Sequence, residues 1–493
     1  MTRPGGLIGG GVCLAALALL ALPAAAGATT FCVPNFHAAC PDNGTNVAEA
    51  NLETAMQASG SDGQADEVRV APGTYTDPDT FTPQGSDPLT VEGAGAAATE
   101  LTSSSAANAY VLNLQDRPGA TFRDLTVAIP AVKLTGAPGV QLRGTLEDVN
   151  ILSRATNGTG IPSVLGDGSS FRGGHIYAES GGSIQTGIAV RANVAPGQTF
   201  TVEDATISGA LSGISLSGPG SVGTVDVRRT RMTVVQVGVS ATSGTADVEN
   251  TQIITPGTPL SAIVHSAVSE SATVNANHVS LSHTGGGTVA VANSNVQSGG
   301  IGDATVNVVN SATSGYSVKF VRQSFGTGSA DVSFSYSNVP STDGSSGGPG
   351  GAVIGPGNID ADPLFADPTA NLALLAGSPS IDAADQTGTA ASEDIDGNPR
   401  PEDGDGDSIA IADQGAYEYP EVADTTPPAT TIDTGPEEGA TILTAQPTFT
   451  FSSNEPGTFE CKLDAGPFAL CSSPHQLTGL DDGPHSFTVK AID

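Results

Sequence analysis

The sequence predicts an all-β protein, in which a parallel β-helix solenoid with an N-terminal capping helix is followed by a small β-sandwich. Three observations predict this fold class. A six-residue pattern recurs about every 26 residues through the middle of the chain. Aromatic residues make up only 4% of the chain and Trp is absent, so the core must be built from Val, Ile, Leu, Ala and Thr, of which the β-branched residues favour strands. Alternating polar and apolar residues near the C-terminus are typical of antiparallel strands.

Composition excludes several functional classes. The chain has 493 residues, with 17 basic against 51 acidic side chains and a net charge of −34, so nucleic acids and anionic membranes are poor partners. Only 14% of the residues are charged, and the acidity therefore reflects scarce Lys and Arg, not a highly charged disordered chain. The length predicts about three domains.

Residues 1–28 have the pattern of a secretory signal peptide. Arg3 provides the positive charge, Val12 to Leu22 is an uncharged apolar run, and two A-x-A cleavage sites lie between Ala24 and Ala28. Cys13 lies inside the apolar run and does not follow the cleavage site, which argues against a lipid anchor. No later run is long enough to cross a bilayer. We therefore expect a secreted or cell-surface protein without a transmembrane segment in its mature form.

The four cysteines of the mature chain form two local pairs. Cys32 lies close to Cys40, and Cys461 lies close to Cys471, with more than 400 residues between the pairs. In an oxidising compartment this spacing predicts the disulfides Cys32–Cys40 and Cys461–Cys471. A zinc site is the alternative, but neither pair has C-x-x-C spacing.

The solenoid is expected over residues 29–340, beginning with its cap. Asn46 to Ser59 places apolar residues on one helical face. Two apolar strands follow, VRVAPGTY from Val68 and LTVEGAG from Leu89. A helix at this position would cover backbone groups that the open end of a solenoid otherwise exposes.

Each copy of the repeat reads as two short strands joined by a bend. The first and sixth positions are apolar and are expected to point inward, and five of the first six copies have Asp, Asn or Gly at the third position, residues that tolerate a left-handed backbone. We expect the first positions to stack, with Val202, Val227, Val248 and Val274 in one buried column. The nine copies start at Phe122, Leu146, Phe171, Val202, Val227, Val248, Val274, Val306 and Val332.

The second position of the repeat alternates in charge. On stacked strands these side chains would form one outward ladder in which every charge lies between two opposite ones. A solvated salt-bridge ladder is the favoured interpretation, and a charged binding stripe is the alternative. The ladder comprises Arg123, Glu147, Arg172, Glu203, Arg228 and Glu249, followed by Asn275 and Asn307.

Three segments resemble known families. The amphipathic helix, the strand with APGTY, the segment LTVEGAG and the coils together resemble the right-handed parallel β-helix of the pectate-lyase-like superfamily. Between residues 358 and 420 the segments NIDADPLF, GSPSIDAAD, DIDGNPRP, DGDGD and DQGAYEY resemble the C-terminal module called choice-of-anchor Q. Residues 426–493 are similar to a bacterial Ig-like repeat. These resemblances imply architecture and not activity, because this superfold is used by enzymes, adhesins and passive surface proteins.

Composition suggests the remaining boundaries. Ser341 to Gly351 is rich in Gly and Ser and predicts a linker, so the Asp-rich module is expected over residues 341–420. Residues 421–428 predict a second, stiffer linker. The Ig-like domain is expected over residues 429–493, and its predicted strands end without the closing strand of such a sandwich, so we expect it to be truncated.

The strongest candidate metal site lies in the Asp-rich module. Carboxylates alternating with Gly can wrap around a hard cation, and calcium is common outside cells. The match to an EF-hand loop is partial, because Ser408 replaces the Gly at position six and Gln414 replaces the Glu at position twelve. An exposed acidic turn is the alternative. The candidate ligands are Asp403, Asp405, Asp407 and Asp413.

One cluster could support polysaccharide cleavage. A lyase needs calcium-binding carboxylates with an Arg or Lys base nearby, and the dense cluster of that kind comprises Arg228, Arg229, Arg231, Asp204 and Asp226. Arg228 already belongs to the charge ladder, which weakens this interpretation. The NTD, DD and GHG pattern typical of polygalacturonases is absent from the coils. Aromatic sugar platforms are not expected on the coils before Tyr316, Phe320, Phe325, Phe334 and Tyr336.

The histidines do not predict a catalytic site. His175 and His278 occupy outward positions of coils far apart along the solenoid, and His265 and His283 are expected in loops. No Ser-His-Asp arrangement follows from these spacings, so all four are predicted to be surface residues.

The sequence favours a function in extracellular binding, adhesion or scaffolding, with polysaccharide or a cell-wall polymer as the ligand. We expect the protein to be a monomer. The alternative is a polysaccharide lyase or glycoside hydrolase of the pectate-lyase-like superfamily. No cofactor is expected besides Ca²⁺.

Overall fold

The structure is a computed structural model, and nearly all its regular elements are strands. Helix α1 (Leu52–Ala58) is the only α-helix in the described part of the chain, where no helix is long and apolar enough to span a membrane. Residues 1–27 of the predicted signal peptide lie outside the described residues. The structure describes residues 28–492 except 61–62, 106–109, 132–138, 155–168, 179–183, 218–219, 221, 257–260, 268–269, 286–288, 388–391, 422–426 and 456.

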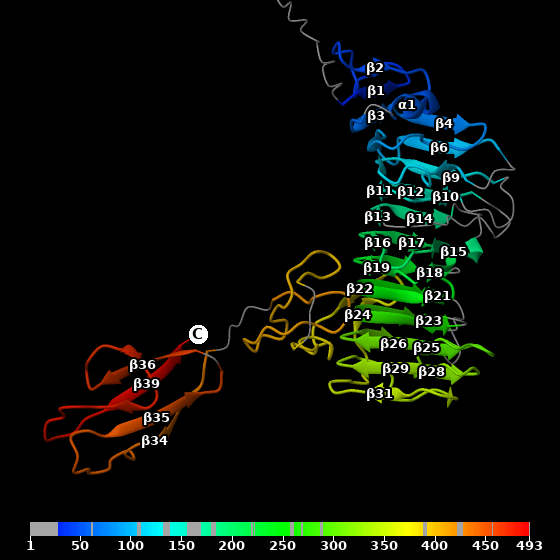
Figure 1. Cartoon of the computed structure of the whole chain (residues 1–493). Coiled ribbons are helices and arrows are strands. Elements are labelled where there is room, and N and C mark those ends of the chain that lie inside the picture. The colour runs from blue at the N-terminus through cyan, green and yellow to red at the C-terminus, as the bar shows by residue number, and fades with distance from the viewer. Residues whose placement is uncertain are drawn as a thin grey trace, which may run out of the picture.

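Parallel strands stacked coil upon coil form a β-helix solenoid, as expected (Figure 1). In the largest sheet most coils contribute one strand before a bend and one after it. The strands before the bend are β1 (Thr30–Val33), β3 (Asp66–Val70), β5 (Leu89–Glu92), β8 (Ala120–Arg123), β11 (Thr145–Glu147), β13 (Ser170–Arg172), β16 (Thr199–Glu203) and β19 (Thr224–Arg228). The strands after it are β4 (Gly73–Asp77), β6 (Thr99–Ser103), β9 (Thr126–Ile129), β12 (Asn150–Ser153), β14 (His175–Ala178), β17 (Thr206–Ser208) and β20 (Arg231–Thr233).

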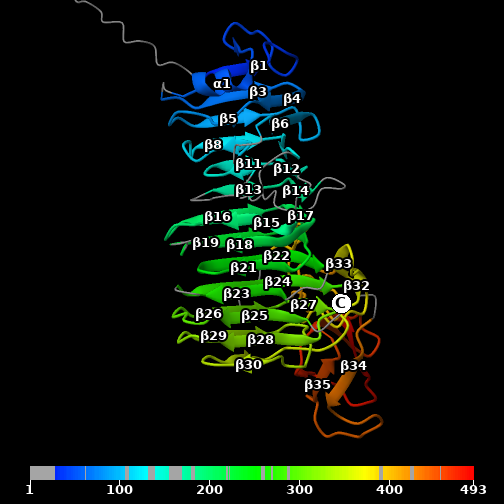
Figure 2. The same cartoon turned by 90° about the vertical axis from the view of Figure 1, so that its right-hand side faces the viewer.

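The later coils continue the same sheet and are joined by a second one. β22 (Gly244–Thr255) and β24 (Ala272–His283) run through the bend, followed by β26 (Ala304–Val309), β27 (Ala312–Ser314), β29 (Ala330–Ser335) and β31 (Ala352–Ile354). The second sheet stacks along another side of the solenoid (Figure 2). It contains β15 (Ile184–Ala192), β18 (Ala210–Leu216), β21 (Val237–Ala241), β23 (Ser261–Ala267), β25 (Ala290–Val296), β28 (Val318–Ser324) and β30 (Ser346–Gly347). The short strands β2 (Val47–Ala48), β7 (Leu112–Asn113) and β10 (Val140–Gln141) complete the N-terminal coils.

The bend at the third position of each repeat is confirmed. Asp124, Asp148, Gly173, Asp204, Arg229 and Asn250 all have positive φ, between +44° and +65°. The left-handed conformation costs Asp, Asn and Gly less free energy than other residues, which explains why they recur there. The column continues in later coils at His278, Asn310 and Tyr336, with φ near +50°. We call these nine residues the bend column.

The predicted register is right for six copies and wrong for three. Val202, Val227 and Val248 stack in one buried column, but Val248 pairs with Ala276, and Val274 pairs with Ala246. The bend of that coil falls at His278, two residues later than the pattern suggested. Because side chains alternate with a period of two, a shift of two residues keeps the same residues facing inward and is hard to detect.

The charge ladder is confirmed through its six charged members. Glu203 pairs in register with Arg172 on one side and Arg228 on the other, so these side chains share one outward column. After Glu249 the column continues with Asn277 and not Asn275. Arg172 lies 3.5 Å from Glu203, whereas Arg228 pairs with Asp226 of its own strand. The ladder is therefore an exposed and incomplete set of ion pairs.

Helix α1 caps the N-terminal end as expected. The Asn51 side chain accepts the Thr54 N–H, and Leu52, Ala55 and Met56 are buried against the first coils. The Cys32–Cys40 disulfide is confirmed in the same region. Arg117 is fully buried below the helix.

Residues 341–354 form a last coil of the solenoid. β30 pairs with β28, and β31 pairs with β29. Lys319 Nζ donates to the Ser341 carbonyl at 2.6 Å, and Arg322 donates to the carbonyl of Pro349. The Gly- and Ser-rich stretch that suggested a linker therefore lies within the solenoid.

Residues 359–420, here called the docked module, fold back onto the flank of the solenoid (Figure 1). The module contains the hairpin of β32 (Phe365–Asp367) and β33 (Asn371–Leu374). Ile254 and Ala312, which point outward from β22 and β27, are buried in a hydrophobic cluster with Leu372 and Tyr417 of the module. The module therefore covers part of the outer face of the largest sheet.

The C-terminal residues form two small antiparallel sheets, as the alternation predicted. One contains β34 (Thr430–Thr434), β35 (Thr448–Ser453) and β38 (His475–Gln476), and the other contains β36 (Thr458–Leu463), β37 (Ala469–Cys471) and β39 (Phe487–Ile492). Phe449, Phe451 and Leu477 form their core. The Cys461–Cys471 disulfide is confirmed and joins β36 to β37.

Candidate functional site

The outward face of the largest sheet carries a continuous row of polar side chains from successive coils. Asp247 on β22, Asn275 on β24, Asn307 on β26 and Ser333 on β29 stand in register. Asn275 Nδ2 donates to Asp247 Oδ1 at 2.8 Å, Asn307 Nδ2 donates to Asn275 Oδ1 at 2.9 Å, and Ser333 Oγ donates to Asn307 Oδ1 at 2.6 Å. We call these four residues the amide ladder.

A second row runs beside the amide ladder. Asn277 Nδ2 donates to Glu249 Oε1 at 3.2 Å, and Asn310 Nδ2 donates to Asn277 Oδ1 at 3.2 Å. A carboxamide has two N–H donors and an oxygen with two lone pairs, so Asn275 and Asn307 of the amide ladder retain hydrogen-bonding capacity beyond these contacts. Neighbouring coils repeat about every 4.8 Å. The face therefore presents regularly spaced donors and acceptors along the solenoid axis.

The cluster proposed for cleavage is assembled, but its cations are already paired. Arg228 contacts Asp226 at 2.8 Å. Arg229 binds both carboxylate oxygens of Asp204, at 2.7 and 2.9 Å, and also contacts Glu203 at 2.9 Å. Arg231 turns away from this group and contacts Asp396 of the docked module. Sequence reasoning missed Asp247, which lies beside Asp226 on the next strand.

The charges in this cluster do not suit a general base. The hydrogen bonds that Arg229 donates to Asp204, and the negative charge of that carboxylate, raise the pKa of Arg229 despite partial burial. Burial favours the neutral form of Arg228, but the hydrogen bond and charge of Asp226 outweigh it and raise the pKa of that guanidinium. A base must lose its proton near neutral pH, so both shifts have the wrong direction. Burial raises the pKa of Asp226, which makes that carboxyl the more plausible proton donor.

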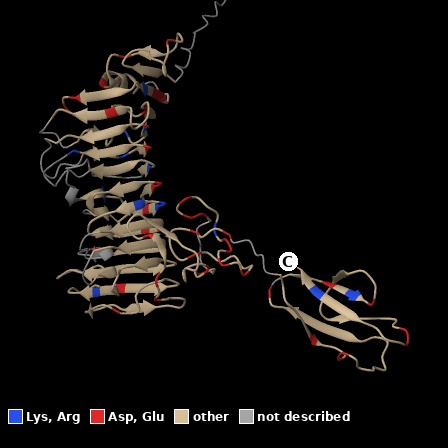
Figure 3. Cartoon of the chain, turned by 180° about the vertical axis from the view of Figure 1, so that it is seen from behind, with Lys and Arg blue, Asp and Glu red and all other residues tan. Residues whose placement is uncertain are grey.

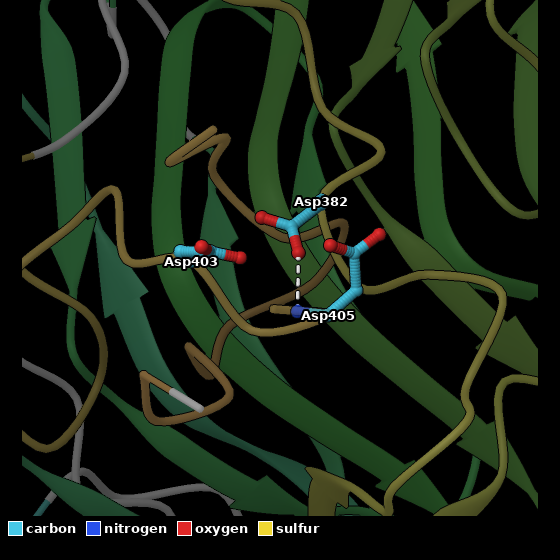
Figure 4. A group of neighbouring side chains, drawn as sticks. All are labelled: Asp382, Asp403 and Asp405. Atoms are coloured by element: carbon cyan, nitrogen blue, oxygen red, sulfur yellow. Dashed lines mark hydrogen bonds between the residues drawn. The ribbon is translucent and has the colours of Figure 1, made fainter. Parts of the chain in front are cut away.

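Three carboxylates of the docked module converge (Figure 4). Oxygens of Asp382, Asp403 and Asp405 all lie within 4.8 Å of one another. Asp382 stands outside the Gly-spaced motif and reaches it only through the folding of the module, so no local sequence signal identified it. Asp407 and Asp413 are not in this group: Asp407 accepts the Ile409 N–H, and Asp413 is fully buried.

These carboxylates also organise their own loop. Asp403 accepts the N–H groups of Gly406 and Ser408, each at 2.7 Å, and Asp382 accepts the Asp405 N–H at 2.8 Å. Burial, together with the charges of Asp405 and Asp403, raises the pKa of Asp382 to about 6. Such a group of oxygens suits a hard cation, and its backbone hydrogen bonds equally suit an acidic turn.

The prediction of surface histidines is wrong for two residues. His278 is fully buried under the docked module, and His283 is buried beside Tyr316, because parts of the fold distant in sequence cover both. The side chain of His265, on β23, lies outside the described residues. His175 is half-buried, and its ring stacks on Tyr177 with centroids 4.4 Å apart.

The aromatic residues expected as sugar platforms are mostly in the core. Tyr316, Phe320 and Phe334 are buried, and Phe325 is exposed. Tyr177 was overlooked in the sequence, although the alternation of β14 places it on the same outward side as His175.

Comparisons with known proteins add little. No protein-family model matches the chain, and no curated protein matches it. A crystal structure of an alginate lyase from Paenibacillus sp. str. FPU-7 is similar, with 16% sequence identity, coverage of 57% of this chain and 98% of that chain, and a TM-score of 0.38. A likeness this distant carries no argument about function, and the β-helix assignment rests on the strand pairing described above.

Proposed function

We propose that this chain is an extracellular β-helix protein that binds an extended polysaccharide along its outer face and does not cleave it. The amide ladder carries the proposal. Its side chains come from successive coils, are held in place by one another and repeat along the axis. Solenoids commonly use such extended faces for binding.

The chemistry of the ladder matches sugar hydroxyl groups. A hydroxyl is both a donor and an acceptor, and so is a carboxamide, so the two can exchange hydrogen bonds in either direction. The ladder brings no unpaired cation to the face, which favours a neutral polymer over a strongly anionic one. The docked module adds to this preference, since residues 359–420 contain 14 acidic side chains and one Arg, a net charge of −13 (Figure 3).

Two further observations support this assignment. The arginines of the candidate lyase cluster each pair with a carboxylate, and the pKa values of Arg228 and Arg229 are raised, so neither of these two arginines is poised as a base. Two disulfides fit an oxidising, extracellular compartment. Surface attachment through a choice-of-anchor-Q-like module and an Ig-like domain remains a prediction from the sequence.

Binding is tested by co-sedimentation of the mature chain with insoluble polysaccharides. Asn275→Ala/Asn307→Ala removes the two central amides and should weaken binding at least tenfold, because it removes several hydrogen bonds of about 1 kcal/mol each. The matched control is Asn293→Ala/Asn295→Ala, which removes two half-buried outward amides from β25 in the second sheet. Equal loss in both variants, or in neither, would contradict binding at the amide ladder.

Cleavage is the second candidate function, favoured by one observation. Asp226 has a raised pKa, through burial, and stands beside Asp247 on the neighbouring strand, so two adjacent carboxyl groups of the kind that cleavage needs lie on one face. The same polysaccharides are therefore assayed for unsaturated and reducing ends, with and without calcium. Products lost in both Asp226→Asn and Arg228→Ala/Arg229→Ala would establish an enzyme, and binding without products would support the first proposal.

We also propose calcium as a ligand of the docked module. The site would use Asp382, Asp403 and Asp405, which the fold brings together. Calcium would relieve the repulsion among three neighbouring carboxylates, and this ion is abundant outside cells.

A further inference from the structure

The C-terminal pair of antiparallel sheets contains a groove that the proposed function does not use. Ile432 of β34 and Phe487 of β39, which belong to different sheets, both line it, and its volume is about 1200 Å³. The floor is apolar. Phe449 of β35 stacks on Phe487 with ring centroids 4.3 Å apart, and Leu463 and Leu477 lie beside this pair. The groove therefore opens onto the hydrophobic core of the domain.

Apolar side chains also stand at the mouth of the groove. Ile432 is 47% exposed, Ile442 is 39% exposed, and Leu443 is fully exposed, and all three line the groove. Single exposed apolar residues are ordinary on a protein surface, but a contiguous exposed patch that continues into a core is typical of an interaction site.

The two strands that border the groove are edge strands. In the described part of the C-terminal sheets, β34 pairs only with β35, and β39 pairs only with β36. The Ala491 N–H donates to Thr430 Oγ1 at 2.8 Å, which joins the two edges at one end of the groove. An edge strand presents N–H and C=O groups to which another extended segment can bind.

The walls of the groove are acidic. Among the described residues that line it there is no Lys or Arg. His485 lines it too, but its ring nitrogens already contact Asp464 Oδ2 at 2.8 Å and the Asp481 carbonyl at 2.9 Å. Lys462 and Lys490 lie over the ring of Phe468, outside the groove. The four acidic side chains of the lining are Glu437, Glu438, Asp481 and Asp482.

We propose that this groove binds an extended segment of another protein, apolar at alternate positions and flanked by Lys or Arg, as an added strand between β34 and β39. Alternate side chains of such a strand would enter the apolar floor, its backbone would pair with a strand edge, and its basic flanks would meet the acidic walls. A second copy of this chain fits poorly, because it has 51 acidic against 17 basic residues and would bring like charges to the walls.

The absence of Trp from the chain provides a direct assay. The probe is the synthetic peptide Lys-Lys-Thr-Val-Thr-Trp-Thr-Val-Thr-Lys-Lys, whose Trp fluorescence reports its binding to the full mature chain without background. Saturable binding with a blue-shifted emission is expected. The same peptide with Glu in place of Lys should bind about tenfold more weakly or worse at low salt. A version N-methylated at the amides between the flanks cannot donate to a strand edge and should not bind measurably.

Variants locate the peptide in the groove. Ile432→Lys places a charge at the mouth and should weaken binding about tenfold or more, because the basic peptide is repelled and an apolar contact is lost. Leu470→Lys is the matched control, since Leu470 is 77% exposed on β37 of the same domain and does not line the groove. It should keep the wild-type affinity. Glu437→Gln/Glu438→Gln, at two exposed positions, should reduce the preference for the Lys-flanked over the Glu-flanked peptide severalfold.

Hydrogen exchange then tests the mode of binding. Amides of β34 or β39 should gain protection when the peptide is added, and amides of β16 and β19 in the solenoid should not change. No saturable binding, or equal binding of the Lys- and Glu-flanked peptides, would overturn the proposal. Equal binding of the parent and N-methylated peptides, or equal loss in Ile432→Lys and Leu470→Lys, would overturn it as well.

Discussion

Arg117 shows how one residue can secure an end of the solenoid. Its Nη1 donates to the Met56 carbonyl at 3.3 Å, to Ser59 Oγ at 3.2 Å and to the Gln84 carbonyl at 2.9 Å. The buried guanidinium thus satisfies carbonyls at the C-terminal end of α1, where helix carbonyls lack partners.

Arg117→Met should lower the free energy of unfolding by about 3 kcal/mol, because several buried carbonyls lose their donor. Denaturant unfolding measures it. Arg172→Met is the matched control: Arg172 lies in the exposed charge ladder, its side chain is 54% exposed, and its loss should cost less than about 1 kcal/mol. Similar costs in the two variants would contradict this role for Arg117.

The calcium proposal can be tested by comparing Asp407, which the sequence predicted as a ligand, with Asp382, which the structure places in the group of three carboxylates. Calcium should stabilise the wild-type chain by about 1.4 kcal/mol when its free concentration is about ten times the Kd. Asp382→Asn should abolish this stabilisation, because Asp382 belongs to the group of three carboxylates. Asp407→Asn should retain it, because Asp407 does not belong to that group. Thermal unfolding with calcium and with magnesium measures both. A wild-type melting curve that calcium does not change would make the site an acidic turn.

Single residues also mark the limit of sequence reasoning. Asp403 and Asp405 could be selected because they lie in one Gly-spaced motif, but Asp382 joins them only after the module has folded. His278 was misplaced for the same reason: its outward position is correct, but a segment more than 100 residues later buries it. Sequence patterns report which face a side chain occupies and not what later covers that face.

At the scale of the coil, the bend column was the most predictable feature. Its left-handed backbone restricts the residue type, which leaves a signal in the sequence. The register of the last three copies could not be predicted equally well, since a shift of two residues preserves the inward side chains and changes only the bend position. Residues 341–351 were predicted to be a linker because they are rich in Gly and Ser. They belong to the last coil, which pairs through its backbone, and composition does not report that pairing.

The cost of a bend can be measured at Asp148, which is exposed and has a φ of +52°. Asp148→Val should lower the free energy of unfolding by about 1–2 kcal/mol, because a β-branched side chain is strained in this conformation. Asp148→Gly should be within a few tenths of a kcal/mol of wild type, or above it. Urea unfolding compares the two. Equal stability of the two variants would mean that the backbone conformation does not restrict this position.

At the scale of the whole molecule, the solenoid and the docked module pack together, and the structure has two kinds of core. Inside the solenoid, the inward-facing apolar side chains of each strand pack against those of the neighbouring coils and form one continuous core. Outside it, Ile254 points away from that interior and is fully buried only because Leu372 and Tyr417 of the module pack on it. The sequence predicted the first core, since it repeats, and could not predict the second, since its members are scattered over residues 254–417.

Two neighbouring residues of β22 should therefore separate docking from folding. Ile254→Asp would bury an unpaired charge under the module, at a cost of several kcal/mol, which undocking avoids. Hydrogen-exchange protection should be lost at Gly415 and Ala416, whose N–H groups donate to the solenoid, while the amides of β16 and β19 remain protected. Ile253 points into the solenoid, and Ile253→Asp should instead lower protection in the coils themselves. If Ile254→Asp unfolds the coils together with the module, docking is required for the solenoid to fold, and the two cores cannot be separated.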